Sequence, residues 1–208
     1  MLRLQRLCKD IFKFPIKIEN MLNFHRINSV NNQFFSNLFN LYTLAFPSLE
    51  RRTWAGLEHE LNYEKRFCAH ALIQDGLFVG LFNYWTFDRF YYIEHLAIIP
   101  KLRSQGIGSE AMDIFMEQTK LPIILEVEMP NNITASRRIL FYEKLGFSIV
   151  ARNYAQPPYD GNGFLMPMLI MSNDIHFVNT HFEKIKDILY ENVYHFEHSK
   201  DKNIVVDE

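Results

Sequence analysis

Two glycines separated by one residue stand between an apolar run at 91–99 and a helix-like pattern at 108–118. The loop that holds them reads Arg103-Ser104-Gln105-Gly106-Ile107-Gly108-Ser109. Glycine adopts positive φ at little cost, so such a loop can turn tightly and aim the unpaired N–H groups of a helix start at one point. The helix dipole adds positive potential there, and the loop therefore predicts a site for a phosphate or pyrophosphate.

A dinucleotide site is one interpretation of this loop. Gly106-x-Gly108-x-x-Ala111 satisfies the G-x-G-x-x-G/A pattern, and Glu126 lies twenty residues beyond the first glycine. In that fingerprint, however, the first glycine follows its strand directly, whereas residues 100–105 intervene here. The acidic residue should also end the next strand, but Glu126 falls inside the apolar run 123–128. The dinucleotide interpretation is therefore the weaker one.

The elements that must position the loop follow from hydrophobic periodicity and turn residues. Asp75-Gly76 is a strong hairpin signal, and Gly146 is expected to stop a helix. Strands are expected at 22–27, 67–73, 77–87, 91–99, 122–128, 147–153 and 164–171, and helices at 31–46, 48–61, 108–118, 134–145 and after Asp174, with Ser48 and Asp174 as N-caps. This order predicts a mixed sheet with helices on its faces, of the α/β or α+β class.

Bulk composition excludes several classes of protein. The chain has 208 residues, 48% of them apolar, and a net charge of −2, which gives no electrostatic case for nucleic acid or an anionic membrane. No apolar run approaches the ~18 residues of a membrane-spanning helix. Cys8 and Cys68 lack metal-site or redox spacing, so we expect no metal and a reducing, cytoplasmic setting.

Three segments are expected along the chain. Residues 1–20 are net basic and read as an extension outside the fold, with a basic amphipathic helix on a membrane as the weaker alternative. Residues 21–172 should form the main domain, and residues 173–208 a C-terminal helix and tail.

Two motifs together resemble a known family. Arg103-x-x-Gly106-x-Gly108 matches the Q/R-x-x-G-x-G/A loop of the GCN5-related N-acetyltransferases (the GNAT superfamily). The run Phe141-Tyr142-Glu143-Lys144-Leu145-Gly146-Phe147 is similar to that family's second signature. The resemblance covers about residues 22–171, and segments 45–52 and 154–159 look like those of a bacterial subgroup acting on small molecules or peptides. It implies a mixed, mostly antiparallel sheet, splayed at an acetyl-CoA site, with helices on both faces.

The resemblance implies acetyl-CoA as cosubstrate and assigns residues to it. The splay is expected between 96–98 and 125–127, so that the pantetheine arm can pair with the exposed strand edge, while a backbone N–H near Ile98 stabilises the developing oxyanion. The expected binding residues are Leu96, Ala97, Ile98, the whole loop from Arg103 to Ser109, Asn132 and Arg138. Many relatives carry an asparagine seven residues before the family's tyrosine, a position that is Ala135 here, so Asn131 or Asn132 is the candidate replacement.

The implied activity is N-acetylation of an amine, on a small molecule or a peptide, by direct attack in a ternary complex. Glu94 is the first candidate for the general base and Glu126 the second, and Tyr142 is the candidate acid for the departing thiolate. Strand alternation should turn His95 to the face opposite Glu94, in a structural role. A non-catalytic acyl-CoA-binding regulatory module and an assembly protein using the C-terminal helix are the alternatives, with a homodimer left open.

Overall fold

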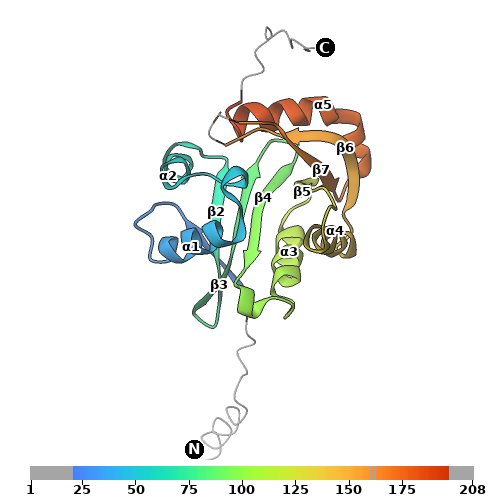
Figure 1. The fold of residues 1–208 in the computed structure, drawn as a ribbon. Coiled ribbons are helices and arrows are strands. Elements are labelled where there is room, and N and C mark those ends of the chain that lie inside the picture. The colour runs from blue at the N-terminus through green and yellow to red at the C-terminus, as the bar shows by residue number, and fades with distance from the viewer. Residues whose placement is uncertain (1–20, 160, 162, 197–208) are drawn as a thin grey trace, which may run out of the picture.

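The computed structural model describes residues 21–159, 161 and 163–196, so the predicted extension 1–20 lies outside the described residues. Within them, seven strands form one sheet in the order β1-β2-β3-β4-β5-β7-β6 (Figure 1). Their bounds are Asn23–Ile27 (β1), Phe67–Gln74 (β2), Leu77–Thr86 (β3), Tyr91–Ile98 (β4), Ile123–Glu128 (β5), Ser148–Gln156 (β6) and Met166–Ser172 (β7). Only the β4–β5 pair is parallel, which confirms a mixed, mostly antiparallel sheet.

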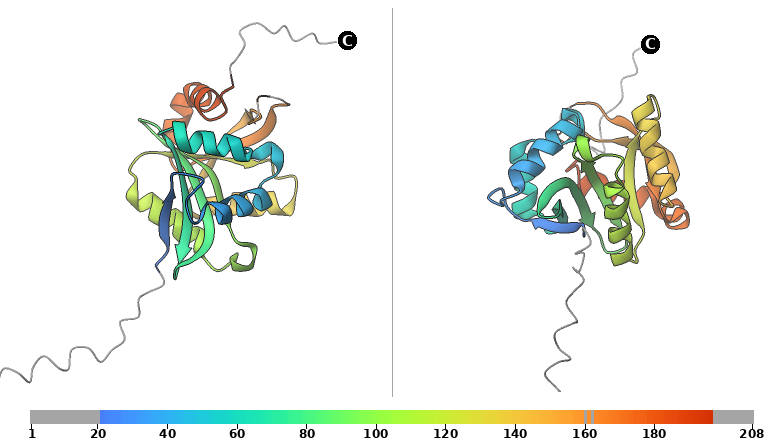
Figure 2. Two further views of the ribbon diagram at one scale, coloured as in Figure 1. Left: turned by 90° about the vertical axis from the view of Figure 1, so that its left-hand side faces the viewer. Right: turned by 90° about the horizontal axis from the view of Figure 1, so that it is seen from below.

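Helices cover both faces of this sheet (Figure 2). Their bounds are Phe35–Ala45 (α1), Trp54–Tyr63 (α2), Ile107–Gln118 (α3), Ile133–Lys144 (α4) and Ile175–Asn192 (α5). Leu38 of α1 and Leu189 of α5 belong to the hydrophobic cluster on one face, and Met112 of α3 to the cluster on the other. Each is fully buried, which stabilises the fold by roughly 1.5–3 kcal/mol per side chain. Residues of α5 thus share a core with the sheet.

The predicted turn residues adopt the expected conformations. Asp75 and Gly76 both have positive φ, at 52° and 76°, as the tight turn between β2 and β3 requires. Gly146 has φ 87° just after α4, and Asp174 accepts a hydrogen bond from the Phe177 N–H at 2.9 Å at the start of α5.

The segment 48–61 does not form the single helix that the sequence predicts. A short 3₁₀ turn occupies Ser48–Glu50, the backbone is extended at Arg51, and α2 begins only at Trp54. Thr53, rather than Ser48, caps α2, accepting from the Gly56 N–H at 3.1 Å. The break turns Arg52 inward, so that the residue is only 4% exposed. Its backbone N–H donates to the Tyr42 hydroxyl.

The sheet opens in the middle, as predicted. The parallel β4–β5 ladder joins only residues 91–93 to residues 123–125. Beyond it, β4 continues beside β3 while β5 continues beside β7. The two strands therefore separate just before Glu94 and Glu126.

A β-bulge changes the expected direction of one side chain. Tyr84 lies opposite Ile93 and Asn83 lies opposite His95, so Glu94 is an extra residue in β4. Because a bulge interrupts strict alternation, Glu94 and His95 both reach groups on the side of α1 and α2. The prediction that they face opposite sides of the sheet is wrong.

Candidate active site

A groove of about 670 Å³ follows the open edge of β4 to the start of α3. Its walls are the residues around the end of β4, the glycine loop and one side of α4. The lining residues are Leu44, Ala45, Phe46, Leu96, Ala97, Ile98, Leu102, Arg103, Ser104, Gly106, Ile107, Gly108, Ser109, Thr134, Arg137, Arg138, Phe141 and Tyr142. The structure thus brings together the predicted strand edge and nearly all of the predicted loop.

The start of α3 forms one end of the groove. Gly106 has φ 87° and precedes the helix, and no side chain of the described residues is seen to cap the first N–H groups. Gly108 lies inside the first helical turn, so only Gly106 needs positive φ; a Cβ at Gly108 would make ordinary contact with Phe141, 3.6 Å away. Gln105 does not line the groove and donates to the Lys101 carbonyl instead. Uncapped N–H groups and the positive end of the dipole suit a pyrophosphate.

The edge of β4 offers hydrogen bonds to an extended ligand. The Ile99 N–H donates to Val79 of β3 at 3.0 Å, so by antiparallel alternation the Ile98 N–H points away from β3, toward the opening. The Arg103 side chain donates to the Ile98 carbonyl at 3.1 Å, which ties the loop to the strand. An amide-rich arm can pair with such an edge as an added strand.

Of the two cofactor-binding residues predicted on and before α4, Asn132 caps the helix and Arg138 lines the groove. Asn132 is the N-cap of α4 and accepts from the Ala135 N–H at 2.8 Å, whereas Thr134, which the sequence analysis did not single out, lines the groove. Arg138 forms an ion pair with Glu128 and lies where the groove meets an inner cavity. The neighbouring Arg137 lines the groove but not the inner cavity.

An inner cavity of about 40 Å³ lies beyond the groove, on the side of α1 and the β6–β7 loop. Phe46, Leu96, Arg138 and Tyr142 line both spaces. The remaining lining residues of the cavity are Glu50, Tyr92, Ile93, Glu94, His95, Glu126, Gln156, Tyr159 and Met168. The two candidate bases and the candidate acid therefore surround one small space.

Glu94 is held by a buried guanidinium. Its side chain is fully buried, forms an ion pair with Arg52 and accepts from the Trp85 indole N–H at 2.8 Å. Arg52 also pairs with Glu60 at 3.3 Å and donates to the Val193 carbonyl at 2.6 Å. Burial alone would raise the pKa of Glu94, but the Arg52 charge and the hydrogen bonds outweigh burial and hold that pKa below its ordinary value.

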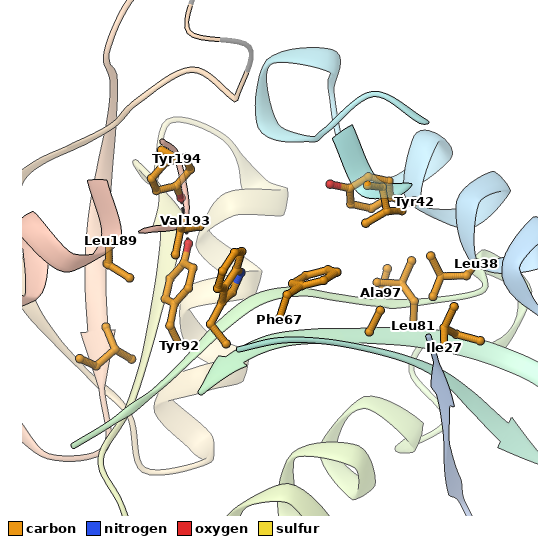
Figure 3. Close-up of a cluster of buried hydrophobic side chains, with 14 of the residues drawn as sticks. Ile27, Leu38, Tyr42, Phe67, Leu81, Tyr92, Ala97, Leu189, Val193 and Tyr194 are labelled. Carbon is orange, nitrogen blue, oxygen red and sulfur yellow. Dashed lines mark hydrogen bonds between the residues drawn. The ribbon is translucent and has the colours of Figure 1, made fainter. Parts of the chain in front are cut away.

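Glu126 is held by phenols instead. The Tyr154 hydroxyl donates to Oε1 at 2.5 Å and the Tyr194 hydroxyl to Oε2 at 2.8 Å. Tyr92 and Tyr194 point their hydroxyls toward each other, 2.9 Å apart (Figure 3). Burial raises the pKa of Glu126 to about 7, although the tyrosine hydrogen bonds act to lower it. This carboxyl changes protonation near neutral pH.

Tyr142 stands at the junction of groove and cavity, with 7% of its surface exposed. Burial raises the pKa of its hydroxyl to about 12, against the opposing effect of the Arg138 charge. The phenol therefore keeps its proton and is a hydrogen-bond donor at neutral pH.

Sequence reasoning missed Arg52 and two of the tyrosines that set the states of the carboxylates. Arg52 and Tyr154 lie within the segments 45–52 and 154–159, which resemblance to a bacterial subgroup had already marked. Tyr194 follows α5 and lies in no segment that a motif or the resemblance singled out. No local pattern could have paired it with Glu126, sixty-eight residues earlier.

Comparison with known proteins identifies the class as an acetyltransferase. The model of the Acetyltransferase (GNAT) family matches residues 35–147, and the chain belongs to this family. A structure described as a GNAT-family acetyltransferase from Bacteroides thetaiotaomicron is 33% identical, with a TM-score of 0.79, and the match covers 84% of this chain and 99% of that one. No protein of curated function matched.

Two more distant structures share the fold. An aminoglycoside 6'-N-acetyltransferase complexed with coenzyme A is 17% identical, with a TM-score of 0.53, over 74% of this chain and 97% of that one. A GNAT-family acetyltransferase from Elizabethkingia anophelis with acetyl-CoA bound is 17% identical, with a TM-score of 0.50, over the same shares of the two chains.

Acetyl-CoA is the cosubstrate of this acetyltransferase, and the groove fits it. The uncapped start of α3 suits the pyrophosphate, the unpaired edge of β4 suits the pantetheine arm, and Arg103 and Arg137 supply positive charge. In the part of the chain that the structure describes, no helix has the length and apolar character needed to span a membrane.

Proposed function

We propose that the protein transfers the acetyl group of acetyl-CoA to an amine, on a small molecule or a peptide, by direct attack in a ternary complex. The observation that carries this proposal is that Tyr142 stands at the junction of groove and cavity while Glu126 lines the cavity that opens from it. A thioester at the end of the groove would meet an acceptor entering from the cavity. A homodimer and a cytoplasmic location stay predictions.

Glu126 is the general base in this proposal. An alkylamine has a pKa of ~10 and must lose a proton before it can attack. A carboxylate with a pKa of about 7 matches neutral conditions better than one held ionised by a guanidinium. The sequence favoured Glu94, but its ion pair with Arg52 argues for a structural role, so the second candidate of the sequence analysis becomes the first.

The remaining groups act on the thioester. The Ile98 N–H points into the opening and would stabilise the oxyanion that forms as the amine attacks. The Tyr142 hydroxyl would donate a hydrogen bond to the departing sulfur. With a pKa of about 12 against ~8.5 for an ordinary thiol, it stabilises the thiolate more readily than it protonates it fully.

Replacing the base tests the proposal most directly. Glu126→Gln should lower kcat by roughly 10²–10⁴ because the amine loses its proton acceptor. Affinity for CoA, measured by calorimetry, should not change, since Glu126 lies outside the groove. Release of CoA thiol with a panel of small amines and peptide N-termini reports kcat.

This experiment also tests the main alternative, a non-catalytic acyl-CoA-binding module. Such a protein would bind CoA but release no thiol with any amine. A Glu126→Gln variant that turns over at the wild-type rate would instead reject Glu126 as the base.

Tyr142→Phe should have a smaller effect. It removes only the hydroxyl and keeps the ring, so kcat should fall about 10- to 100-fold with little change in Tm. The loss should shrink for an acyl donor whose thiol is more acidic, because a better leaving group needs less help. Unfolding of the variant, or unchanged turnover, would leave Tyr142 a packing residue.

A further inference from the structure

Two buried polar atoms at the inner cavity have no hydrogen-bond partner among the described residues. They are Nδ1 of His95 and Nε2 of Gln156, and both side chains are 4% exposed. A buried polar atom left unpaired costs about 1–3 kcal/mol. Both residues line the cavity, so a ligand bound there is the candidate partner for the two atoms.

The two atoms require opposite partners. The Nε2–H of His95 donates to the Glu50 carbonyl at 3.0 Å, and burial lowers the pKa of the imidazole, so Nδ1 is an acceptor at neutral pH. A second acceptor, Oε2 of Glu94, lies 3.9 Å from Nδ1. The amide N–H of Gln156 is a donor. A complementary ligand group must donate on one side and accept on the other.

Charge decides between the groups that could do both. Three carboxyl groups line the cavity, but Arg52 compensates that of Glu94. Glu50 and Glu126 remain against one lining guanidinium, that of Arg138, which is itself paired with Glu128. A carboxylate on the ligand would be repelled, and a second ammonium would meet the donor of Gln156 with the wrong sign. A neutral amide or hydroxyl satisfies both atoms without either penalty.

Size points the same way. A water-sized atom needs roughly 10–15 Å³ of cavity volume. The inner cavity of about 40 Å³ therefore holds about three heavy atoms. An amide group has that size, and a hydroxymethyl group is smaller. The rest of the acceptor could leave the cavity past Phe46 and Tyr159, which are only partly buried.

We infer that the preferred acceptor is an amine that carries a neutral amide or hydroxyl group on the adjacent carbons, recognised by His95 and Gln156. The inference rests on the proposed function and names its substrate class. The neutral group would fill the inner cavity beside these two residues, and the amine would lie where the cavity meets the groove.

Matched small amines test the inference. Glycinamide and ethanolamine should show kcat/KM, expressed per unprotonated amine, at least about 100-fold above that of propylamine, because propylamine leaves both buried atoms unpaired. Glycine should fall below glycinamide, since its carboxylate meets the acidic lining. Equal values for glycinamide and propylamine would overturn the inference.

Two variants assign the preference to residues. Gln156→Met keeps the volume but removes the donor, and His95→Gln can keep a donor to the Glu50 carbonyl while removing Nδ1. Each should reduce the preference for glycinamide over propylamine to below about tenfold. Gln118→Met, at an exposed position at the end of α3, is the matched control and should keep the full preference. A preference that survives both site variants would overturn the assignment.

Binding separates this inference from the proposed function. If no amine is acetylated but calorimetry in the presence of CoA shows glycinamide binding tighter than propylamine, and Gln156→Met abolishes the difference, the subsite is correct and the enzyme proposal fails. If amines are acetylated without any preference for glycinamide, the enzyme proposal holds and the subsite inference fails. Neither turnover nor selective binding would reject both.

Discussion

Two glutamates occupy equivalent positions where β4 and β5 part, yet their surroundings differ in kind. Glu94 meets the Arg52 guanidinium, whereas Glu126 meets the hydroxyls of Tyr154 and Tyr194. A full positive charge more than offsets burial, and neutral donors do not. Residue type and burial alone therefore do not set the pKa of these two carboxyl groups; the charge of the partner decides the direction of the shift.

The partners of the two glutamates also differ in how much of the fold they connect. Arg52 links Glu94 of β4 to Glu60 of α2 and to the Val193 carbonyl beyond α5. Three parts of the chain that are distant in sequence thus converge on one ion-pair network. Among the described residues no cation forms an ion pair with Glu126, and its hydrogen-bond donors are neutral phenols.

The largest expected effect is on stability. Glu94→Gln leaves the Arg52 charge buried with only part of its compensation, and breaking a buried pair on one side costs about 3–5 kcal/mol. The free energy of unfolding, measured by urea titration, should fall by that amount. Glu126→Gln should not lower it near neutral pH, because it removes a carboxyl whose ionisation burial disfavours.

A triple variant sharpens this test. Arg52→Met, Glu60→Gln and Glu94→Gln together remove the guanidinium and both carboxylates paired with it, so the triple variant should be more stable than Glu94→Gln alone. If Glu94→Gln is as stable as the wild type and loses only turnover, Glu94 regains its place as the base.

The sequence predicted most of the groove because local motifs encode it. The glycine loop, the strand before it and the helix after it are contiguous, so Gly106 could be placed from spacing, and the open edge around Ile98 followed from the resemblance to the GNAT family. The cavity was harder. Its character depends on Arg52, Tyr154 and Tyr194, which are brought together only by tertiary packing, and on a one-residue bulge at Glu94 that periodicity cannot foresee.

The second effect is a pH dependence of stability with opposite signs for the two carboxylates. With a pKa of about 7 when folded and ~4.3 when unfolded, Glu126 makes the folded state bind more protons between those values. Its contribution is present below pH ~4.3 and is lost as the pH rises to about 7. Glu94, with a lowered pKa, contributes at neutral pH and loses its contribution as the pH falls through its folded pKa.

Glu126→Gln isolates this effect. Because glutamine does not titrate, the stability of the wild type relative to the variant should decline between pH 5 and 7, by up to about 1.4 kcal/mol per pH unit. Urea titrations of both proteins across this range measure the difference. Curves that stay parallel would mean that Glu126 is already ionised at pH 5.

The smallest effect concerns the phenols that hold Glu126. Tyr194→Phe removes one donor to its carboxylate, and such bonds act to lower its pKa. A hydrogen bond of about 0.5–1.5 kcal/mol corresponds to roughly 0.5–1 pKa unit, so the acidic limb of the kcat/KM profile should move up by that amount. Carboxyl ¹³C NMR of Glu126 should show the same shift without relying on turnover.

Tyr190→Phe is the matched control, because it removes a hydroxyl from α5 that donates to the Ala155 carbonyl rather than to Glu126. It should leave the acidic limb where it is. If Tyr194→Phe moves the NMR titration but not the activity profile, Tyr194 tunes a carboxyl that is not the base. If it moves neither, the Tyr194 hydroxyl does not tune Glu126, and the pKa of this carboxyl is set by burial, by Tyr154 and Tyr92, and by the charge of Glu94.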